Sequence, residues 1–456
     1  MSGYVESSTY WESARARGVT LNRTPETRVV VTGIEAMTPL GYLSETMQAF
    51  RESRSGVISR EVGNCHTRLQ APLPELFDPM SELTREERKM MGFLGAMEVV
   101  IARRAGKAAG VIGENGRLLD RVAHKNRVGA WIGSGIAEAP YLIEVDKHLH
   151  REVNGVVDPV ANSRRISPTL AVRVFPEEPN GDVARLLGLS GESGNTVEAC
   201  ATGASNIYHG YKSILSGEND IVFVGGFEET LREHARMVLG IFAGINALST
   251  RNDSPETASR PFDSGRDGFV AASGGALLVL EGLNHALRRE APILAEVLGA
   301  AKSIDGHAKT ESLPLRIADT IAQALYDPST GGLWKPDGFF AHATSTQIGD
   351  KNEAEAFQLV FGDETGDIPV TAIKSFIGHT LGGAGAVNAA VAIQSLLDGE
   401  IPHILNLQNP DPEITNAVKM TFVRNHFMKH PMRTALAVAY GFGGYNCALL
   451  LGRYIP

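Results

Sequence analysis

The chain has 456 residues, of which 43% are hydrophobic, so it can build one large or two medium domains with buried cores. A formal net charge of −9 and the lack of a dense basic stripe argue against a nucleic-acid partner, since phosphate binding needs a basic surface. We expect a cytoplasmic protein without a membrane span, because the sequence contains neither a long apolar run nor the apolar core of a secretory signal.

The first part of the chain, residues 1–27, is interpreted as a polar N-terminal extension, because its acidic residues argue against a transit peptide. The folded part is predicted to begin at residue 28 with the β-branched run RVVVTG. Strands such as 128–135 and 220–226 then alternate with helical stretches such as 201–216. This alternation favours an α/β architecture.

Two segments near the ends of the predicted halves resemble each other weakly. GGALLVLEG at 274–282 and GGYNCALLLGR at 443–453 each place a glycine pair before a buried apolar strand. Their similarity predicts two related halves, 28–290 and 291–456. Two unrelated glycine turns before strands are the alternative.

The three cysteines, Cys65, Cys200 and Cys447, are odd in number and far apart, which argues against disulfides and against a metal site. Cys200 lies in GNTVEACATGASNIYHGYKSIL, between a predicted strand and a predicted helix. Unpaired backbone N–H groups and the helix dipole at such a junction favour a reactive thiolate. A small core residue at a crowded junction is the alternative interpretation.

Two later motifs contain histidines at predicted corners. In PDGFFAHATSTQIGD, His342 ends an apolar strand, where α/β folds usually bind ligands, and Thr344 and Thr346 can hydrogen-bond across the corner. In AIKSFIGHTLGGAGAV, Lys374 and His379 lie five residues apart, before a run of small residues that permits close packing. Each motif taken alone is also compatible with a structural role.

The last motif, AYGFGGYNCALLLG, places glycines around Phe442 before a buried strand. It is either a simple β-turn or a flexible turn that offers a backbone N–H to an oxyanion and moves Phe442 as a gate.

In this order, EACATGASN, HATSTQIGD, KSFIGHTLGGAGA and GFGGYN resemble the β-ketoacyl-acyl carrier protein synthases, the elongating type II condensing enzymes of fatty acid and polyketide synthesis. The stretch 247–270 is also similar to that family. The resemblance implies a thiolase-like α/β fold, with two duplicated βαβαβαββ halves in a five-layer αβαβα arrangement. It implies a homodimer, or a heterodimer with a related subunit, and neither cofactor nor metal.

The resemblance also implies roles for individual residues. Cys200 would accept the acyl chain from an acyl carrier protein, while His342 and His379 would bind the malonyl thioester and promote loss of carbon dioxide. Lys374 would hold the histidines in place, and the N–H groups of Cys200 and Phe442 would form the oxyanion hole.

Two further sets of residues are expected to contact the substrate and the carrier. The substrate pocket would be lined by Ile136, Phe242, Thr344, Thr346, Gly441 and Gly443. Carrier contact would come from Arg85, Arg88 and Lys89, which face acidic carrier helices in the family. An ordinary core isoleucine at 136 and a solvated helical face at 85–89 are the alternatives.

Several positions depart from the family pattern. Glu198 replaces a small or hydroxyl residue and could raise the pKa of the thiol if it pointed inward. Ala343, Tyr445 and Asn246 also replace the usual residues, and segment 174–182 is atypical. We interpret these changes as signs of a specialised fatty acid or polyketide pathway.

A non-catalytic partner subunit of the chain-length-factor kind is the alternative, although such subunits usually lack the nucleophile. A degradative thiolase would need a cysteine in the final glycine motif.

Overall fold

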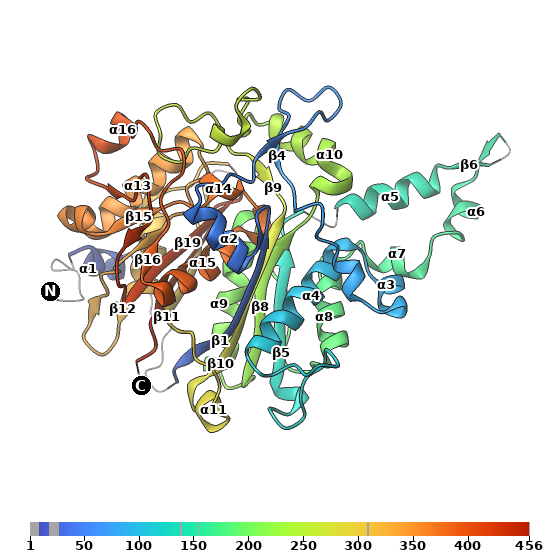
Figure 1. Cartoon of the computed structure of the whole chain (residues 1–456), viewed down its shortest axis with the longest axis horizontal. Coiled ribbons are helices and arrows are strands. Elements are labelled where there is room, and N and C mark those ends of the chain that lie inside the picture. The colour runs from blue at the N-terminus through green and yellow to red at the C-terminus, as the bar shows by residue number, and fades with distance from the viewer. Residues whose placement is uncertain (1–8, 18–26, 137–138, 154, 308–309, 456) are drawn as a thin grey trace.

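The computed structural model describes residues 9–17, 27–136, 139–153, 155–307 and 310–455. The centre of the molecule is a hydrogen-bonded sheet of eleven strands (Figure 1). The first half contributes β1 (Val29–Thr38), β10 (Gly274–Gly282), β8 (Ile221–Glu228), β5 (Val128–Ser134) and the short β2 (Gly41–Tyr42). The second half contributes β11 (Ala295–Ile304), β20 (Tyr445–Gly452), β19 (Thr434–Gly441), β14 (Phe339–Phe340), β15 (Pro369–Thr371) and β17 (Thr421–Phe422).

The same strand pattern occurs in both halves. In the first half, β1 pairs antiparallel with β10, β10 antiparallel with β8, and β8 parallel with β5. In the second half, β11, β20, β19 and β14 follow each other with the same sequence of directions. The two glycine-led segments of similar sequence form β10 and β20, which hold equivalent places. The duplicated α/β architecture is therefore confirmed.

Helices cover and separate the two parts of the sheet. The layer between them consists of α9 (Thr202–Leu215) and α15 (Ala384–Asp398), which pack on each other. Helices α4 (Phe93–Ala108) and α8 (Glu178–Leu187) cover the first half (Figure 1). Helix α12 (Pro314–Leu325) packs on β11 and β20 of the second half, and α13 (Gln347–Phe361) packs on α12. The order helix, sheet, helix, sheet, helix gives the five expected layers.

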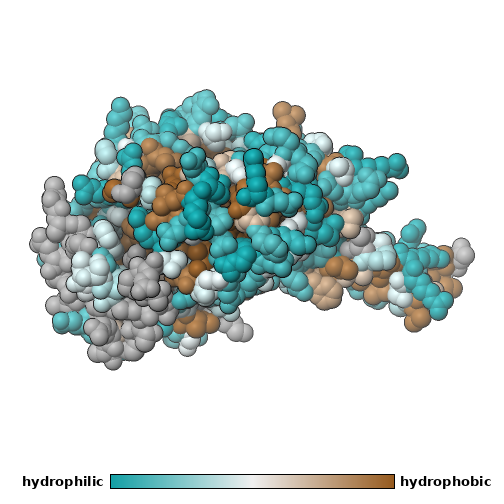
Figure 2. Space-filling view, turned by 90° about the horizontal axis from the view of Figure 1, so that it is seen from below, coloured by the Kyte–Doolittle hydropathy of each residue, from teal (hydrophilic) through white to brown (hydrophobic). Residues whose placement is uncertain are grey.

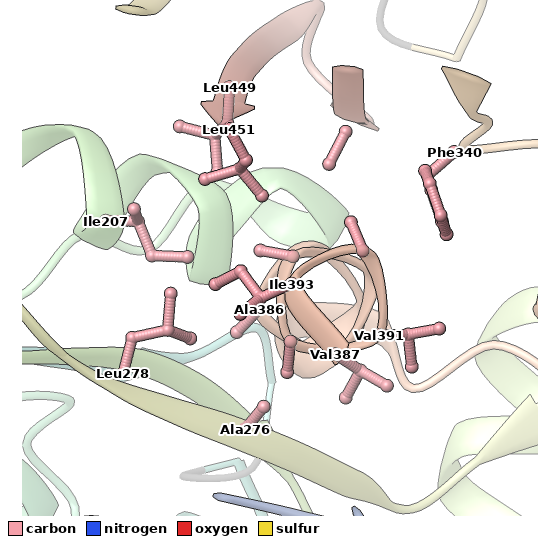
Figure 3. Close-up of a cluster of buried hydrophobic side chains, with 14 of the residues drawn as sticks. Ile207, Ala276, Leu278, Phe340, Ala386, Val387, Val391, Ile393, Leu449 and Leu451 are labelled. Atoms are coloured by element: carbon pink, nitrogen blue, oxygen red, sulfur yellow. The ribbon is translucent and has the colours of Figure 1, made fainter. Parts of the chain in front are cut away.

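Helix α15 is buried on almost every side because it runs through the middle layer. Figure 3 shows its Ala386, Val387 and Val391 among apolar side chains from both parts of the sheet. The small residues allow this close approach, since a Cβ on Gly385 would lie only 2.7 Å from the Cβ of Ala204 on α9.

The described part of the N-terminal extension is docked on the body. Helix α1 (Thr9–Ala16) buries Ala14, and the Tyr10 hydroxyl donates to Asp319 on α12 at 2.8 Å. Arg17 donates to the same carboxylate at 2.6 Å. The remaining residues of the extension, 1–8 and 18–26, lie outside the described ranges.

An arm projects from the body beyond the end of β5 (Figure 1). It consists of α5 (Ala139–Leu149), β6 (Glu152–Val153), β7 (Val156–Val157), α6 (Pro159–Ser163) and α7 (Pro168–Val172). The arm occupies the unusually long stretch between the motif at β5 and the nucleophile. Across the described ranges, no helix has the length and apolar character needed to cross a membrane.

Candidate active site

A cavity of about 490 Å³ lies between the two halves. It brings together Cys200, His342, His379 and the turn around Phe442, which are far apart in the sequence. Each comes from a loop or corner next to a buried strand or helix, so the rigid sheet and the middle helices fix their positions. The four predicted motifs therefore meet in one place.

Cys200 lies in the short turn Ala199–Ala201 that leads into α9. The backbone N–H groups of Cys200 and Phe442 favour its ionised form, as does the Lys374 ammonium. Burial outweighs these effects and raises the pKa of the Cys200 thiol to about 12. The backbone N–H groups act in the direction expected of a helix end, but burial has the larger effect and favours the neutral thiol.

The carboxylate that raises the pKa of Cys200 is Glu228, at the end of β8. Its Oε2 accepts from the N–H groups of Gly135 at 3.0 Å and Gly382 at 3.2 Å, so it ties together two loops beside the site. Glu198 instead points to the other side of the corner, where it pairs with Lys302. The concern that Glu198 faces the thiol is thereby removed.

The two histidines line the same cavity and face each other closely. Their ring centroids are 5.4 Å apart and the rings are nearly perpendicular, at 85°. Burial and the nearby Lys374 charge hold the pKa of His342 and that of His379 well below the ordinary histidine value. Both rings are consequently neutral at physiological pH, and each carries one N–H donor.

Lys374 is buried beneath His342. Its Nζ donates to the backbone carbonyl oxygen of His342 at 2.5 Å and lies 3.5 Å from His342 Nδ1. Because Nδ1 faces the lysine, the other ring nitrogen of His342 is the one available to a ligand. Burial lowers the pKa of Lys374 to about 8, although Glu353, Cys200 and Asp350 each pull that pKa upward.

Two acids of helix α13, Asp350 and Glu353, are buried beneath the histidine corner. Glu353 accepts from the N–H groups of His342 and Ala343, each at 2.7 Å, and Asp350 accepts from Ser345 N–H at 3.1 Å. This support matters because Ala343, with a φ of +23°, and Ser345, with a φ of +68°, are strained. Sequence reasoning missed both roles, since a carboxylate that binds backbone leaves no side-chain pattern.

Phe442 and the predicted pocket residues divide between the cavity and an apolar cluster beside it. Phe442, Gly441, Thr344 and Thr346 line the cavity, and the two threonine hydroxyls lie 3.0 Å apart, as expected. Ile136 and Phe242 instead pack with Cys200 and Phe442 in the apolar cluster, where the Phe242 and Phe442 ring centroids are 6.3 Å apart. Gly443 does not line the cavity, but its φ of +88° suits glycine in the turn.

The residues that line the cavity include Asn246 and two exposed isoleucines, Ile245 and Ile348, which we assign to its mouth because they are open to solvent. Neither lysine nor arginine is among the described residues that line the cavity. The predicted carrier contacts, Arg85, Arg88 and Lys89, are exposed on α3 (Arg85–Met90), outside the cavity lining. The structure therefore does not bring this basic helix into the wall of the site.

The described residues contain no cluster suited to a metal ion, and the three cysteines are free. Cys447 is buried on β20, and Cys65 is only partly buried beside the apolar cluster.

Comparison with known proteins gives a consistent picture. Residues 26–286 match the family described as "Beta-ketoacyl synthase, N-terminal domain", and residues 294–408 match its C-terminal domain. A 3-oxoacyl-[acyl-carrier-protein] synthase 2 of Coxiella burnetii is 34% identical over 93% of this chain and 98% of its own length.

Solved structures agree with the family match. One of them is the structure of a type II polyketide synthase acyl carrier protein in complex with its ketosynthase. A chain of that structure superposes on this chain with a TM-score of 0.79 at 25% identity, covering 94% of this chain and 100% of its own length. The ishigamide ketosynthase/chain length factor gives the same TM-score and the same coverage at 27% identity. With the site geometry, these similarities show that the chain belongs to the β-ketoacyl synthase family of condensing enzymes.

Proposed function

We propose that this chain is a ketosynthase that joins an acyl group on Cys200 to a malonyl thioester, with loss of carbon dioxide. The observation that carries the proposal is the cavity that holds a thiol and two neutral imidazoles, with the buried Lys374 bonded to the His342 backbone behind it. Acyl transfer needs a nucleophile and oxyanion donors, whereas decarboxylation needs donors that stabilise an enolate. The cavity contains both sets.

In the first step, Cys200 Sγ attacks the carbonyl carbon of an acyl thioester. The N–H groups of Cys200 and Phe442 donate to the oxyanion, and the C–S bond to the donor then breaks. The proton of the Cys200 thiol ends on the departing donor thiol. Because the pKa of Cys200 is raised, its proton leaves only as the attack takes place.

In the second step, the malonyl thioester binds with its carbonyl oxygen toward the N–H groups of His342 and His379. The bond to the carboxylate breaks, carbon dioxide leaves, and the electron pair becomes an enolate. Neutral imidazoles suit this task, since they donate hydrogen bonds without transferring a proton to the enolate carbon. Lys374 holds the His342 backbone and keeps that ring neutral.

In the third step, the enolate carbon attacks the thioester carbonyl on Cys200. A carbon–carbon bond forms, the Cys200 C–S bond breaks, and Sγ leaves as a thiolate that takes up one proton. The product is a β-ketoacyl thioester. The acyl chain extends into the apolar cluster of Ile136, Phe242 and their neighbours once Phe442 has moved aside.

The thioester donor in this proposal is an acyl carrier protein, as in the solved carrier–ketosynthase complex named above. Ile245 and Ile348 at the mouth would contact the carrier through apolar side chains, whereas the basic helix α3 would add charge contacts farther away. The departures from the family pattern support a specialised fatty acid or polyketide pathway.

The assembly proposed for this chain is a dimer, with a second copy or with a related subunit. Strand β5 ends the order of the sheet, and the segment beside it, 191–197, exposes Val197. The adjoining arm exposes further apolar side chains, namely Leu142, Val156, Val157, Val160 and Val172. Figure 2 shows hydrophobic residues at the surface of the projecting arm. A partner on this face would cover them.

Mass spectrometry of the intact protein after incubation with a panel of acyl-loaded carrier proteins tests the proposal. We expect a stable acyl adduct on the wild type that the Cys200→Ala variant lacks. An adduct that persists in the variant, or no adduct with any donor, contradicts the proposed role. The chain-length-factor alternative predicts no adduct, and the position of Cys200 in the cavity argues against it.

A further inference from the structure

Glu198 comes two residues before the nucleophile, yet its side chain does not line the cavity. Its Oε1 forms an ion pair with Lys302 Nζ, and its Oε2 accepts from the Ser205 hydroxyl at 2.6 Å. The residue is buried. A carboxylate that costs free energy to bury therefore lies directly behind the nucleophile, with both oxygens engaged.

The ion pair connects the two halves of the molecule. Glu198 belongs to the first half, whereas Lys302 lies on β11, opposite Cys447 of β20. Lys302 Nζ also lies 3.2 Å from Nε2 of His209, whose ring stacks on Trp131 with centroids 4.6 Å apart. The ammonium is thus held from two sides, which gives the Glu198 carboxylate a fixed anchor.

The backbone between Glu198 and Cys200 needs such an anchor. Ala199 has a φ of +49°, a left-handed conformation that costs free energy for a residue with a side chain. Glu198 N–H donates to the Thr202 hydroxyl at 2.8 Å, and its carbonyl oxygen accepts from Ala201 N–H at 3.1 Å. All of these contacts hold the corner in the strained shape that turns Cys200 toward the cavity.

The same corner supports the turn that carries Phe442. Gly441, at the end of β19, packs directly on the Glu198–Cys200 corner. A Cβ on Gly441 would lie 2.4 Å from the Glu198 carbonyl oxygen and 3.2 Å from Cys200 N. The two oxyanion donors therefore come from different halves, and their spacing depends on how the Glu198–Cys200 corner sits against the β19–β20 hairpin.

We propose that Glu198 is a positioning residue, whose ion pair with Lys302 sets the spacing between the two oxyanion donors, the N–H groups of Cys200 and Phe442. The proposal rests on the proposed acyl transfer to Cys200. It assigns Glu198 no contact with the reacting atoms. It also explains why an acidic residue is tolerated beside a nucleophile, since the carboxylate faces away from the sulfur.

Two reactions of Cys200 distinguish a positioning role of Glu198 from an effect of its charge on the thiol. Acylation by an octanoyl thioester of N-acetylcysteamine needs the oxyanion donors and no carrier, whereas alkylation by iodoacetamide displaces iodide and needs only the thiolate. We expect Glu198→Ala and Lys302→Met to slow acylation about 10-fold or more, since loss of one oxyanion donor costs about 100-fold or more in other enzymes. The rate of Cys200 alkylation, measured by peptide mass spectrometry across the alkaline pH range, should be the same in both variants as in the wild type. The pH profile of that rate should also be unchanged.

Glu192→Ala is the matched control, because Glu192 accepts from Trp131 Nε1 at 3.0 Å in the same network without touching the corner. It should leave both reactions unchanged. If Glu198→Ala fails to fold, Glu198→Gln and the Glu198→Gln/Lys302→Met double variant replace it, because they keep the side-chain volume. They should show the same selective loss of acylation.

Three results would overturn the proposal: unchanged acylation, an equal loss of both reactions, or a shifted alkylation pH profile. The last would mean that Glu198 acts on the thiol through its charge. Absence of acylation in the wild type, with Cys200 still alkylated, would count against the proposed function instead.

Discussion

The two histidines of the cavity differ from surface histidines in how they titrate. The pKa of each is lowered well below 6.5 by burial and by Lys374, so each stays neutral as the pH falls through the range where an ordinary histidine becomes charged. Enolate stabilisation as proposed needs the neutral rings. Carbon dioxide release from a malonyl thioester should therefore stay nearly constant between about pH 7.5 and 6. A loss of half the rate near pH 6.5 would contradict this prediction. Circular dichroism over the same range is the control for unfolding.

Lys374 should be the residue whose change most alters that pH dependence. In a Lys374→Met variant, the positive charge that helps to hold the pKa of both histidines down is gone. We expect the acid limb of the decarboxylation profile to move to higher pH, and the rate at neutral pH to fall because the His342 backbone loses its donor. Lys351→Met, which removes an exposed pair with Glu413, is the control. An unmoved acid limb would show that burial alone sets the histidine pKa values.

At this scale, the sequence allowed prediction of the groups that carry chemistry. Cys200, His342, His379 and Lys374 were identified because thiol, imidazole and ammonium groups stand in recognisable motifs. The supporting carboxylates were not identified, since Glu228 and Glu353 bind backbone N–H groups that are brought together only by the fold. The raised pKa of Cys200 was missed for the same reason, because burial is a property of the whole structure.

At the scale of elements, helix α1 is where the structure differs most from the prediction made from the sequence. Its polar composition suggested an extension, yet Tyr10 and Arg17 converge on Asp319 of α12, beside the buried Ala14. Burial and hydrogen bonding to Asp319 both raise the pKa of the Tyr10 hydroxyl. The α/β class, in contrast, was predicted from the alternation of strands and helices, and the two glycine-led segments indicated two related halves, because buried strands leave a clear apolar pattern.

We expect Tyr10→Phe to lower the free energy of unfolding by about 1 kcal/mol, since it removes one part-buried hydrogen bond to a carboxylate and little else. Differential scanning calorimetry should then show a melting temperature lower by about 1–2 °C. Tyr454→Phe is a suitable comparison, because Tyr454 contacts the Arg28 guanidinium through its ring and takes no part in the bond between Tyr10 and Asp319. If Tyr10→Phe melts like the wild type, α1 contributes nothing to the body through this bond.

At the scale of the whole molecule, the face formed by segment 191–197 and the arm is the one that a partner would cover. Neither the arm nor its exposure could be predicted from local patterns, because its helices have apolar residues that would fit a core equally well. The five layers themselves came from the family resemblance. Periodicity alone indicates strands and helices without saying how two halves stack.

A charge placed on this face should prevent self-association. We expect Val197→Glu to shift the protein from dimer to monomer in sedimentation velocity, because a desolvated carboxylate without a partner is costly in an interface. Leu76→Glu is the control, since Leu76 is 98% exposed on another part of the surface. A wild type that sediments as a monomer at all concentrations would contradict the homodimer and leave a related subunit as the partner.

The raised pKa of Cys200 has a consequence for the lifetime of the enzyme in an oxidising cell. Peroxides and electrophiles attack thiolates, and the raised pKa of Cys200 keeps its thiolate scarce at neutral pH. We therefore expect the resting thiol to react slowly with peroxides and electrophiles. The enzyme becomes vulnerable mainly during turnover, in the brief interval after product formation when the sulfur has left as a thiolate and has not yet regained its proton.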